Sequence, residues 1–299
     1  MNFLELDGDA RNGYIKEKYS RRVFFAGNKH GVIIQVENIL KNSKPNPELL
    51  VPVEGVWAIQ FVYKYEVQIK HMIVCTEEMN SNESILLFEK IMDANLELGV
   101  YLTSKKVFEK ISEKANSAGI LVLCKYPKRR LEDLTVDQNA LVVILDGLEI
   151  PGNVGTIVRS ADGTDVSAVI ICNKKTRLTH PKYVKSSQGS CFKVPVTETD
   201  YEAIFDWLEK NNFRIILTDT RANTNYYEEN FEGRVAIIVG SERYGISKEW
   251  YKKAYTGIKI PMFGDCDSLN VGIATTVILY EATLKKKKML KRSDLYIHR

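Results

Sequence analysis

Gly240-Ser241-Glu242-Arg243-Tyr244-Gly245 directly follows the apolar run Val235-Ala236-Ile237-Ile238-Val239, and together the two segments are the strongest indication of fold in the chain. A continuous β-branched run predicts a strand that is buried on both faces of a sheet. The glycines allow the following loop to turn sharply and to approach a ligand closely, and Ser241 and Glu242 offer oxygen acceptors. By itself this loop is compatible with a plain turn, so the rest of the chain decides its meaning.

Three more apolar runs predict further strands of the same sheet, over residues 140–145, 168–171 and 214–217. Helical segments such as residues 201–210 separate them. Strands of this kind are typical of a parallel sheet with helices on both faces, in which ligands bind at the loops after the strands. The sequence therefore predicts an α/β fold whose ligand site lies in these loops, where the chain places Gly152, Gly155, Gly240, Gly245 and Gly264.

The loop after the first of these strands begins at Asp146 and opens a predicted helix that contains Arg159. Its glycines are spaced Gly-x-x-Gly in Gly152-Asn153-Val154-Gly155, and the segment that follows the helix is basic. A dinucleotide-binding fold requires Gly-x-Gly-x-x-Gly and an acidic residue about 20 positions later, so the pattern argues against a dehydrogenase. Taken alone, Arg159 is compatible with a surface position on an amphipathic helix.

Two segments near the end of the chain complete the pattern. Ile260-Pro261-Met262 ends a predicted short strand, and Ser268-Leu269-Asn270-Val271 begins a helix predicted over residues 269–284. Ser268 or Asn270 is the expected N-cap, because either side chain can accept a hydrogen bond from the first turn.

These segments resemble, in order and spacing, the three motifs of the SpoU branch of the SPOUT RNA methyltransferases over residues 140–285. The resemblance implies a parallel-sheet domain tied in a trefoil knot, an exception to the rule that chains do not thread loops. It also implies S-adenosylmethionine as cofactor, bound in the knot by Leu217, Thr218, Val239, Gly240, Ile260, Met262, Ser268 and Leu269. Backbone groups of these loops are expected to read the adenine, and the apolar identity of Leu217, Ile260 and Leu269 suits a flat, desolvated base.

The resemblance further implies methylation of a ribose 2′-hydroxyl in structured RNA by a homodimer whose interface includes the helix over residues 269–284. Because the sulfonium already supplies an electrophile and a good leaving group, the protein mainly has to orient the hydroxyl. We expect Arg159 to clamp the target phosphate and ribose, since a guanidinium is a poor proton acceptor at neutral pH. Asn153 is expected to orient Arg159 or the ribose, and Glu242 and Asn270 to support the loops. The proton of the 2′-hydroxyl is expected to pass to an RNA phosphate oxygen or to water.

Two residues depart from the family pattern. Asp165 stands where the family usually has glycine, and Gly272 replaces a common serine. Neither change removes an expected cofactor or catalytic residue, so both bear on the subfamily alone.

The first 130 residues alternate helical and strand-like runs and predict a separate small α/β domain. Helices are expected over residues 53–65, 85–96 and 105–115, and strands over residues 72–75, 99–102 and 119–124. This part resembles the small RNA-binding domain, related to ribosomal proteins, that precedes many SpoU catalytic domains. The expected organisation is an extension over residues 1–22, an RNA-binding domain over 23–135 and the methyltransferase domain over 136–299. The extension either folds on the domain or forms an arm that contacts RNA.

Composition predicts a folded, soluble chain of two domains, with 44% hydrophobic and 27% charged residues among 299. No apolar run approaches the roughly 18 residues of a membrane helix, and the N-terminus is unlike a signal peptide, so we expect a cytoplasmic protein. The five scattered cysteines predict reduced core thiols and no metal site.

Residues 166–197 carry six basic residues and no acidic one, and residues 285–299 carry seven basic residues against one aspartate. Such patches suit RNA, although the tail is equally compatible with a solvated surface.

Ribosomal RNA is favoured over transfer RNA as the substrate, because residues 146–153 resemble the ribosomal-RNA subgroup and a separate N-terminal domain is present. An alternative from another class is a catalytically silent RNA-binding module. The presence of Arg159, Asn153 and the cofactor loops argues against that alternative. The sequence does not identify the target nucleotide.

Overall fold

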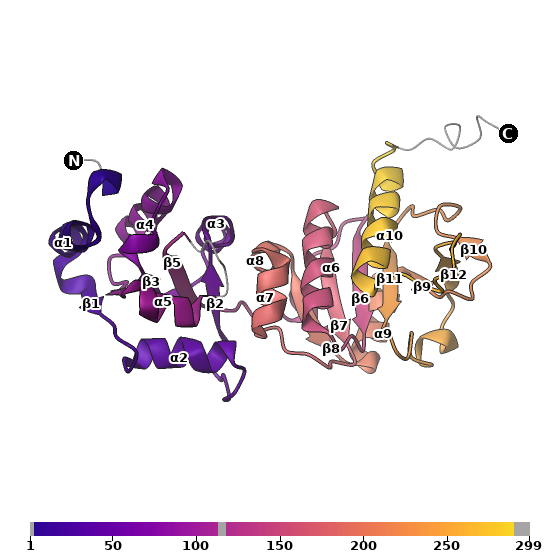
Figure 1. Cartoon of the computed structure of the whole chain (residues 1–299). Helices are drawn as coiled ribbons and strands as arrows, with labels where there is room; N and C mark the ends of the chain where they lie inside the picture. The colour runs from indigo at the N-terminus through magenta and orange to yellow at the C-terminus, as the bar shows by residue number, and fades with distance from the viewer. Residues whose placement is uncertain (1–2, 113–117, 290–299) are drawn as a thin grey trace. The chain divides into compact units, whose positions relative to one another are not determined.

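The computed structural model of the chain describes residues 3–112 and 118–289. Its contacts divide it into two compact units, the first formed by residues 1–127 with 178–192 and the second by residues 128–177 with 193–299 (Figure 1). The division after Pro127 falls in the charged linker, eight residues before the expected boundary at 135. Residues 178–192 group with the first unit, unlike the expected continuous domain over 136–299, because α7 (Pro181–Ser187) contacts β2 (Leu50–Glu54).

The first unit contains a five-stranded sheet in the order β1-β4-β3-β5-β2. The parallel strands are β1 (Val23–Phe25), β4 (Val100–Leu102) and β3 (Ile69–Val74). Strand β5 (Ile120–Lys125) runs antiparallel to both β3 and β2. The helices of its N-terminal part are α1 (Gly8–Tyr19), α2 (Gly31–Leu40), α3 (Val56–Lys64), α4 (Asn82–Ala94) and α5 (Lys105–Ile111). A core cluster joins α2 and α5 to the sheet through Ile33, Val36, Phe108, Ile73 and Leu123.

The strands expected in the first unit are confirmed as β3, β4 and β5, and the expected helices as α3, α4 and α5. The helix expected from residue 53 begins at Val56, because Val53 lies in β2 and Gly55 turns the chain with a φ of 86°. Residues 113–115 of the expected third helix lie outside the described residues. The sequence analysis missed α1, α2, β1 and β2; α1 buries only Ile15 and Tyr19, too few to produce a helical period.

The N-terminal extension folds onto the first unit. Arg11 donates hydrogen bonds from Nη1 to the carbonyl of Thr76 at 2.8 Å and from Nη2 to the carbonyl of Leu4 at 3.0 Å. Tyr19 is buried, with its ring edge-on to Phe88 at 5.6 Å. Of the two alternatives for this extension, the structure therefore supports the folded one over residues 3–22.

The second unit contains a seven-stranded sheet in the order β10-β12-β9-β11-β6-β7-β8, in which every neighbouring pair is parallel. Its strands are β6 (Leu141–Asp146), β7 (Ala168–Cys172), β8 (Val196–Thr199), β9 (Arg214–Thr218), β10 (Thr224–Asn225), β11 (Val235–Gly240) and β12 (Thr256–Lys259). The expected α/β fold with a parallel sheet is confirmed. The trefoil knot stays a prediction of the resemblance.

Helices cover this sheet on both faces. Alternate strand residues such as Ile144 and Ile238 pack with Ile204 and Leu208 of α9 (Tyr201–Lys210) and with the fully buried Trp250. The residues between them point to the opposite face, where α6 (Pro151–Gly163) contacts β7 and α10 (Val271–Lys286) contacts β11. Helices α6 and α10 also contact each other and lie side by side in Figure 1.

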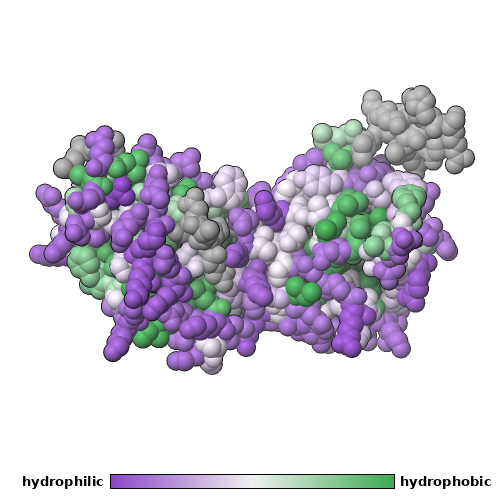
Figure 2. Space-filling view, viewed as in Figure 1, coloured by the Kyte–Doolittle hydropathy of each residue, from purple (hydrophilic) through white to green (hydrophobic). Residues whose placement is uncertain are grey.

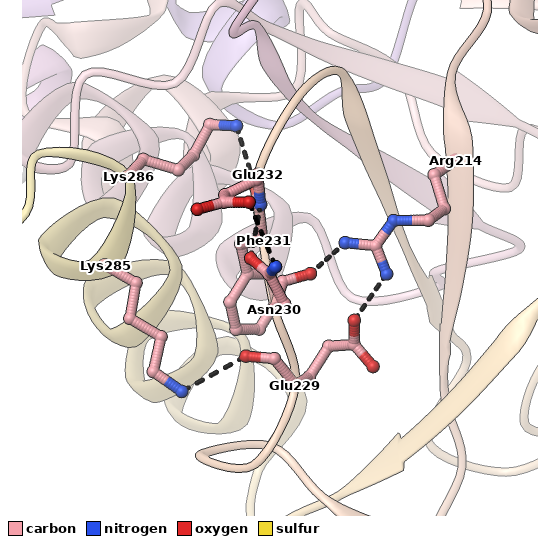
Figure 3. Close-up of polar contacts among 7 residues, drawn as sticks. All are labelled: Arg214, Glu229, Asn230, Phe231, Glu232, Lys285 and Lys286. Carbon is pink, nitrogen blue, oxygen red and sulfur yellow. Dashed lines mark hydrogen bonds and ion pairs between the residues drawn. The ribbon is translucent and has the colours of Figure 1, made fainter. Parts of the chain in front are cut away.

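The end of α10 is tied to the loop between β10 and β11 (Figure 3). Lys286 Nζ donates hydrogen bonds to the carbonyls of Phe231 at 2.8 Å and Gly233 at 2.6 Å and to Asn139 Oδ1 at 3.1 Å. Lys285 Nζ donates to the carbonyl of Glu229 at 3.1 Å, and Arg214 pairs with the Glu229 carboxylate. The first lysines of the basic tail therefore bind the protein itself, and residues 290–299 of that tail lie outside the described residues.

Within the described parts of the chain, no helix has the length and apolar character needed to cross a membrane. All five cysteines are free thiols. As expected for core residues, Cys75, Cys124, Cys172 and Cys191 are buried, and burial raises the thiol pKa of Cys75 to about 11 and of Cys172 to about 12. Cys266 is the exception, because it lies exposed in the loop before α10.

Candidate functional site

A cleft of about 510 Å³ opens at the carboxyl ends of β9, β11 and β12. The loops after these strands and the first turns of α10 form its walls. Its lining includes Thr218, Asp219, Arg221, Val239, Gly240, Glu242, Tyr244, Tyr251, Lys259, Ile260, Met262, Asp267, Ser268, Leu269, Val271, Ala274 and Ile278. The cleft lies where a parallel sheet is expected to bind its ligand.

Seven of the eight expected cofactor residues line this cleft: Thr218, Val239, Gly240, Ile260, Met262, Ser268 and Leu269. The eighth, Leu217, does not. Its side chain is fully buried in the core cluster on the α9 side of the sheet. Successive side chains of a strand point to opposite faces, and this alternation turns Leu217 away from the cleft.

The loop after β11 is a tight turn that requires its glycines. Ser241 and Gly245 exchange two backbone hydrogen bonds of 3.1 and 2.9 Å. A Cβ on Gly240 would lie 2.2 Å from the carbonyl carbon of Gly245, and Gly245 itself has a φ of 68°. Ser241 Oγ accepts a hydrogen bond from the backbone N–H of Tyr244 at 3.0 Å. The turn holds Glu242 and Tyr244 at the cleft wall.

Three of the four expected catalytic residues meet beside the cleft. Asn153 Nδ2 donates a hydrogen bond to Glu242 Oε1, and Asn270 Nδ2 donates to Asn153 Oδ1 at 3.3 Å. Asn270 Oδ1 also accepts from the backbone N–H groups of Gly272 at 3.0 Å and Ile273 at 3.4 Å, which makes Asn270, and not Ser268, the N-cap of α10. We call Asn153, Glu242 and Asn270 the amide–carboxylate cluster.

Arg159 lies apart from this cluster. It is exposed on α6, and within the described residues it has no hydrogen bond or ion pair and does not line the cleft. It stands six positions after Asn153, which at about 100° per residue places it roughly 120° around the helix. The structure therefore leaves the guanidinium accessible but does not bring it to Asn153.

Asp219 is a cleft residue that the sequence analysis missed. Tyr251 donates a hydrogen bond to its Oδ2 at 2.6 Å, and Arg221 donates from Nε to Oδ1 and from Nη2 to Oδ2, both at 3.2 Å. Burial alone would raise the pKa of Asp219, but these hydrogen bonds outweigh it and lower the pKa to about 2. The one signal in the sequence was the position of Asp219 directly after a predicted strand.

Asp146 is a second carboxylate without an assigned role in the sequence analysis. It is 1% exposed and accepts hydrogen bonds from Tyr201 Oη at 2.8 Å and from the backbone N–H of Ser247 at 2.7 Å. Burial raises the pKa of Tyr201, whose oxygen also lies 2.8 Å from Ser247 Oγ and can accept the serine proton. Asp146 thereby ties the end of β6 to the segment that follows the Ser241–Gly245 turn.

The two departures from the family pattern have local explanations. Asp165 has a φ of 56°, a conformation that glycine adopts without strain, and its carboxylate pairs with Lys287 at 3.1 Å. A Cβ on Gly272 would lie 3.2 Å from both Asn270 Oδ1 and Thr156 Cγ2. Gly272 thus allows α10 to approach α6 closely beside the amide–carboxylate cluster. Across the described residues, no group of three or more His, Cys, Asp or Glu side chains is arranged to hold a metal ion.

Comparison with known proteins identifies relatives of this architecture. Residues 140–280 match the SpoU rRNA Methylase family. The 23S rRNA (guanosine(2553)-2′-O)-methyltransferase RlmP of Bacillus subtilis is 26% identical over 200 residues, which are 66% of this chain and 79% of that protein. A protein of Staphylococcus epidermidis named as a TrmH family tRNA/rRNA methyltransferase is 36% identical over 153 residues. That match covers 51% of this chain and 61% of the staphylococcal protein.

Two solved structures share the fold over most of the chain. A structure described as an RNA 2′-O ribose methyltransferase has a TM-score of 0.76 at 27% identity and covers 90% of this chain and all of that one. The SpoU methyltransferase AviRb from Streptomyces viridochromogenes, in complex with AdoMet, has a TM-score of 0.75 at 22% identity. It covers 88% of this chain and all of that one, and at this identity it shows a shared fold alone.

Proposed function

We propose that this chain, whose residues 140–280 match the SpoU rRNA Methylase family, transfers a methyl group from S-adenosylmethionine to a ribose 2′-hydroxyl of RNA. The observation that carries the proposal is the meeting of Asn153, Glu242 and Asn270 at the edge of the cleft. These residues come from three separate segments of the chain and belong to the three motifs. Methyl transfer from labelled S-adenosylmethionine to RNA tests the proposal.

The cleft suits S-adenosylmethionine in shape and in charge. Gly240 lets the Ser241–Gly245 turn close tightly at the cleft wall, and Ile260, Met262 and Leu269 provide apolar surface for an adenine. The lining carries three carboxylates, Asp219, Glu242 and Asp267, against two cations, Arg221 and Lys259. This excess of negative charge complements a sulfonium. The bound cofactor would supply an electrophilic methyl group and a neutral leaving group.

In the mechanism that we propose, the chain's own residues orient the substrate. Arg159 clamps the phosphate and ribose of the target nucleotide, and its exposed guanidinium, which has no partner among residues 3–112 and 118–289, supports this role. Glu242 and Asn270 support the loops and hold the Asn153 amide through the hydrogen bonds described above. The amide presents its polar edge to the ribose. The hydroxyl proton leaves to an RNA phosphate oxygen or to water, because neither an amide nor a guanidinium accepts it at neutral pH.

We propose ribosomal RNA as the substrate, with transfer RNA as the alternative. The relative from Bacillus subtilis is named for 23S rRNA, whereas the staphylococcal relative is named for both kinds of RNA. Mapping 2′-O-methyl groups on both RNAs from a strain that lacks this chain distinguishes the two substrates. A missing methyl group in transfer RNA alone would reverse the preference. We further propose that the first unit binds the RNA and that the enzyme acts in the cytoplasm.

We also propose a homodimer that covers the exposed part of α10. Ile273 and Tyr280 of this helix are 55% and 48% exposed, and Ile150 before α6 is 51% exposed. Figure 2 shows hydrophobic surface gathered on the second unit. Large apolar side chains that lie together on a surface favour burial against a partner. Sedimentation that shows a monomer at micromolar concentration would count against the dimer.

A catalytically silent RNA-binding module remains the alternative from another class. Nothing in the amide–carboxylate cluster favours it, because the three side chains and the cleft are all present. The silent module predicts RNA binding without methyl transfer and without affinity for S-adenosylmethionine, which calorimetry measures directly.

A further inference from the structure

Aromatic side chains are exposed at the edge strand β1 of the first unit. Phe24 and Phe25 are 45% and 62% exposed, although phenylalanine is usually buried. Strand β1 is the outermost strand of its sheet and pairs with β4 alone among the described strands. Because successive side chains of a strand alternate, the two rings lie on opposite faces of the sheet, and each has part of its surface exposed.

The ring of Phe24 is held in place by residues of the neighbouring strand β4 and the residue before it. It stacks on Tyr101 with ring centroids 5.3 Å apart and an interplanar angle of 25°. Tyr101 is in turn flanked by His30 at 5.2 Å and His71 at 5.3 Å, and burial lowers the pKa of His71. A Cβ on Gly99 would lie 3.2 Å from the Phe24 ring, so glycine lets this ring lie close to β4. Phe24 is thus a supported ring with part of its surface free.

Basic residues flank these rings in the sequence. Residues 16–30 contain five Lys or Arg and one acidic residue. Of these basic residues, Lys16, Arg21 and Lys29 are exposed and form no ion pair within the described residues. The Lys16 ammonium lies 6.0 Å from the centroid of the Phe25 ring. Unpaired cations next to exposed rings complement a polyanion that carries aromatic groups.

We propose that this β1 edge surface, formed by Phe24 and Tyr101 on one face of the sheet, Phe25 and Lys16 on the other, and Arg21 and Lys29 from the segments that flank the strand, binds unpaired nucleotides of the RNA substrate, with one base stacked on Phe24. The inference rests on the proposed RNA function. Proteins hold single-stranded RNA by stacking bases on aromatic side chains and by placing cations along the phosphates. A duplex keeps its base faces covered and cannot use the ring. A protein partner that covered this surface would remove water from three cations without supplying phosphates to pair with them. RNA therefore fits the surface better.

Fluorescence anisotropy on the full chain tests the proposal with a labelled single strand of twelve uridines and a labelled duplex of twelve base pairs. Phe24→Leu keeps an apolar side chain but removes the stacking plane, and Phe24→Tyr keeps the plane. Leu86→Ala is the matched control, because Leu86 is 64% exposed on α4 of the same unit. We expect Phe24→Leu to weaken single-strand binding about tenfold. We expect Phe24→Tyr and Leu86→Ala to change it by less than about twofold, and every variant to keep its duplex affinity and its affinity for S-adenosylmethionine.

Unchanged single-strand affinity in Phe24→Leu would overturn the proposal, and so would an equal loss for the duplex. Loss of self-association in sedimentation, with RNA affinity intact, would identify the surface as a protein interface instead. The same experiments test the proposed enzymatic function independently of this surface. If the wild-type chain binds the single strand through Phe24 but transfers no methyl group, the surface stands and the enzymatic proposal falls.

Discussion

Asn270 donates a hydrogen bond from Nδ2 to Oδ1 of Asn153, across 3.3 Å, and so joins the first turn of α10 to the first turn of α6. The same two helices meet again further along, where Ser160 Oγ and Thr276 Oγ1 lie 2.6 Å apart. The amide–carboxylate cluster is therefore built on a packed pair of helices and not on loops alone, which keeps its amide groups in a fixed orientation.

Asn270 has two separable roles, and two substitutions distinguish them. Asn270→Ala removes the N-cap of α10 and should lower the free energy of unfolding by about 1 kcal/mol. Asn270→Ser keeps a capping oxygen but loses the amide that reaches Asn153, so its stability should stay close to that of the wild type. We expect both variants to transfer methyl groups at least about tenfold more slowly. Urea unfolding and single-turnover methylation measure the two effects; a fully active Asn270→Ser would remove the Asn153 contact from the mechanism.

The carboxylate of Asp219 should stabilise the fold in a pH-dependent manner. Its pKa in the folded chain is about 2, below the ordinary value of 3.8 for an aspartate. This stabilisation is fully present above about pH 4 and is lost as the pH falls through 2, because protonation removes the acceptor for Arg221 and Tyr251. We expect Asp219→Asn to unfold at lower urea concentration than the wild type at pH 7, with a difference that shrinks toward acid. A difference that grows between pH 5 and pH 3 would contradict this assignment.

Lys286 should stabilise the attachment of α10 to the loop before β11. Lys286→Met removes three hydrogen bonds and leaves two backbone carbonyls without this donor, which should cost about 2 kcal/mol at pH 7. Lys288→Met, at an exposed neighbour, is the control and should cost little. Burial lowers the pKa of Lys286 to about 8, so between pH 8 and 10.5 the unfolded chain binds more protons than the folded one. The free energy of unfolding of the wild type, measured in urea, should therefore rise relative to that of Lys286→Met as the pH increases from 8 to 10.5.

Arg159 is expected to act on RNA and not on the cofactor. Arg159→Ala should leave the affinity for S-adenosylmethionine within about threefold, while methyl transfer falls a hundredfold or more. Arg159→Lys should perform little better, because a point charge cannot reproduce the planar guanidinium. Calorimetry and single-turnover methylation decide between the roles. A collapse of cofactor binding would move Arg159 to the cleft, and a near-normal rate would remove it from the mechanism.

The strands and their loops could be predicted because each strand is a continuous apolar run and each loop follows one directly. The positions of Thr218, Gly240, Ile260 and Leu269 at the cleft follow from that rule. Leu217 shows its limit, because an apolar run does not reveal which of its side chains face a ligand and which face the core. Asp219 could not be assigned, since its partner Tyr251 stands 32 positions later in the chain.

Short or weakly patterned elements were missed for a different reason. Strand β1 has three residues and exposes both of its phenylalanine rings, so its sequence shows no alternation of buried and exposed positions. Helix α7 contacts β2, which lies far away in the chain, and no local pattern indicates that residues 178–192 group with the first unit. Contacts over such separations depend on the assembled fold.

Alkaline hydrolysis of labelled RNA distinguishes methylation of a ribose 2′-hydroxyl from methylation of a base. Ribosomal RNA from cells that lack this chain is incubated with the purified protein and with S-adenosylmethionine labelled in its methyl group. A 2′-O-methyl group blocks alkaline cleavage at its nucleotide, so we predict that the label appears in alkali-resistant dinucleotides. Label in mononucleotides would indicate methylation of a base, and RNA without label would show that this chain does not catalyse the reaction on that substrate; either result would contradict the account.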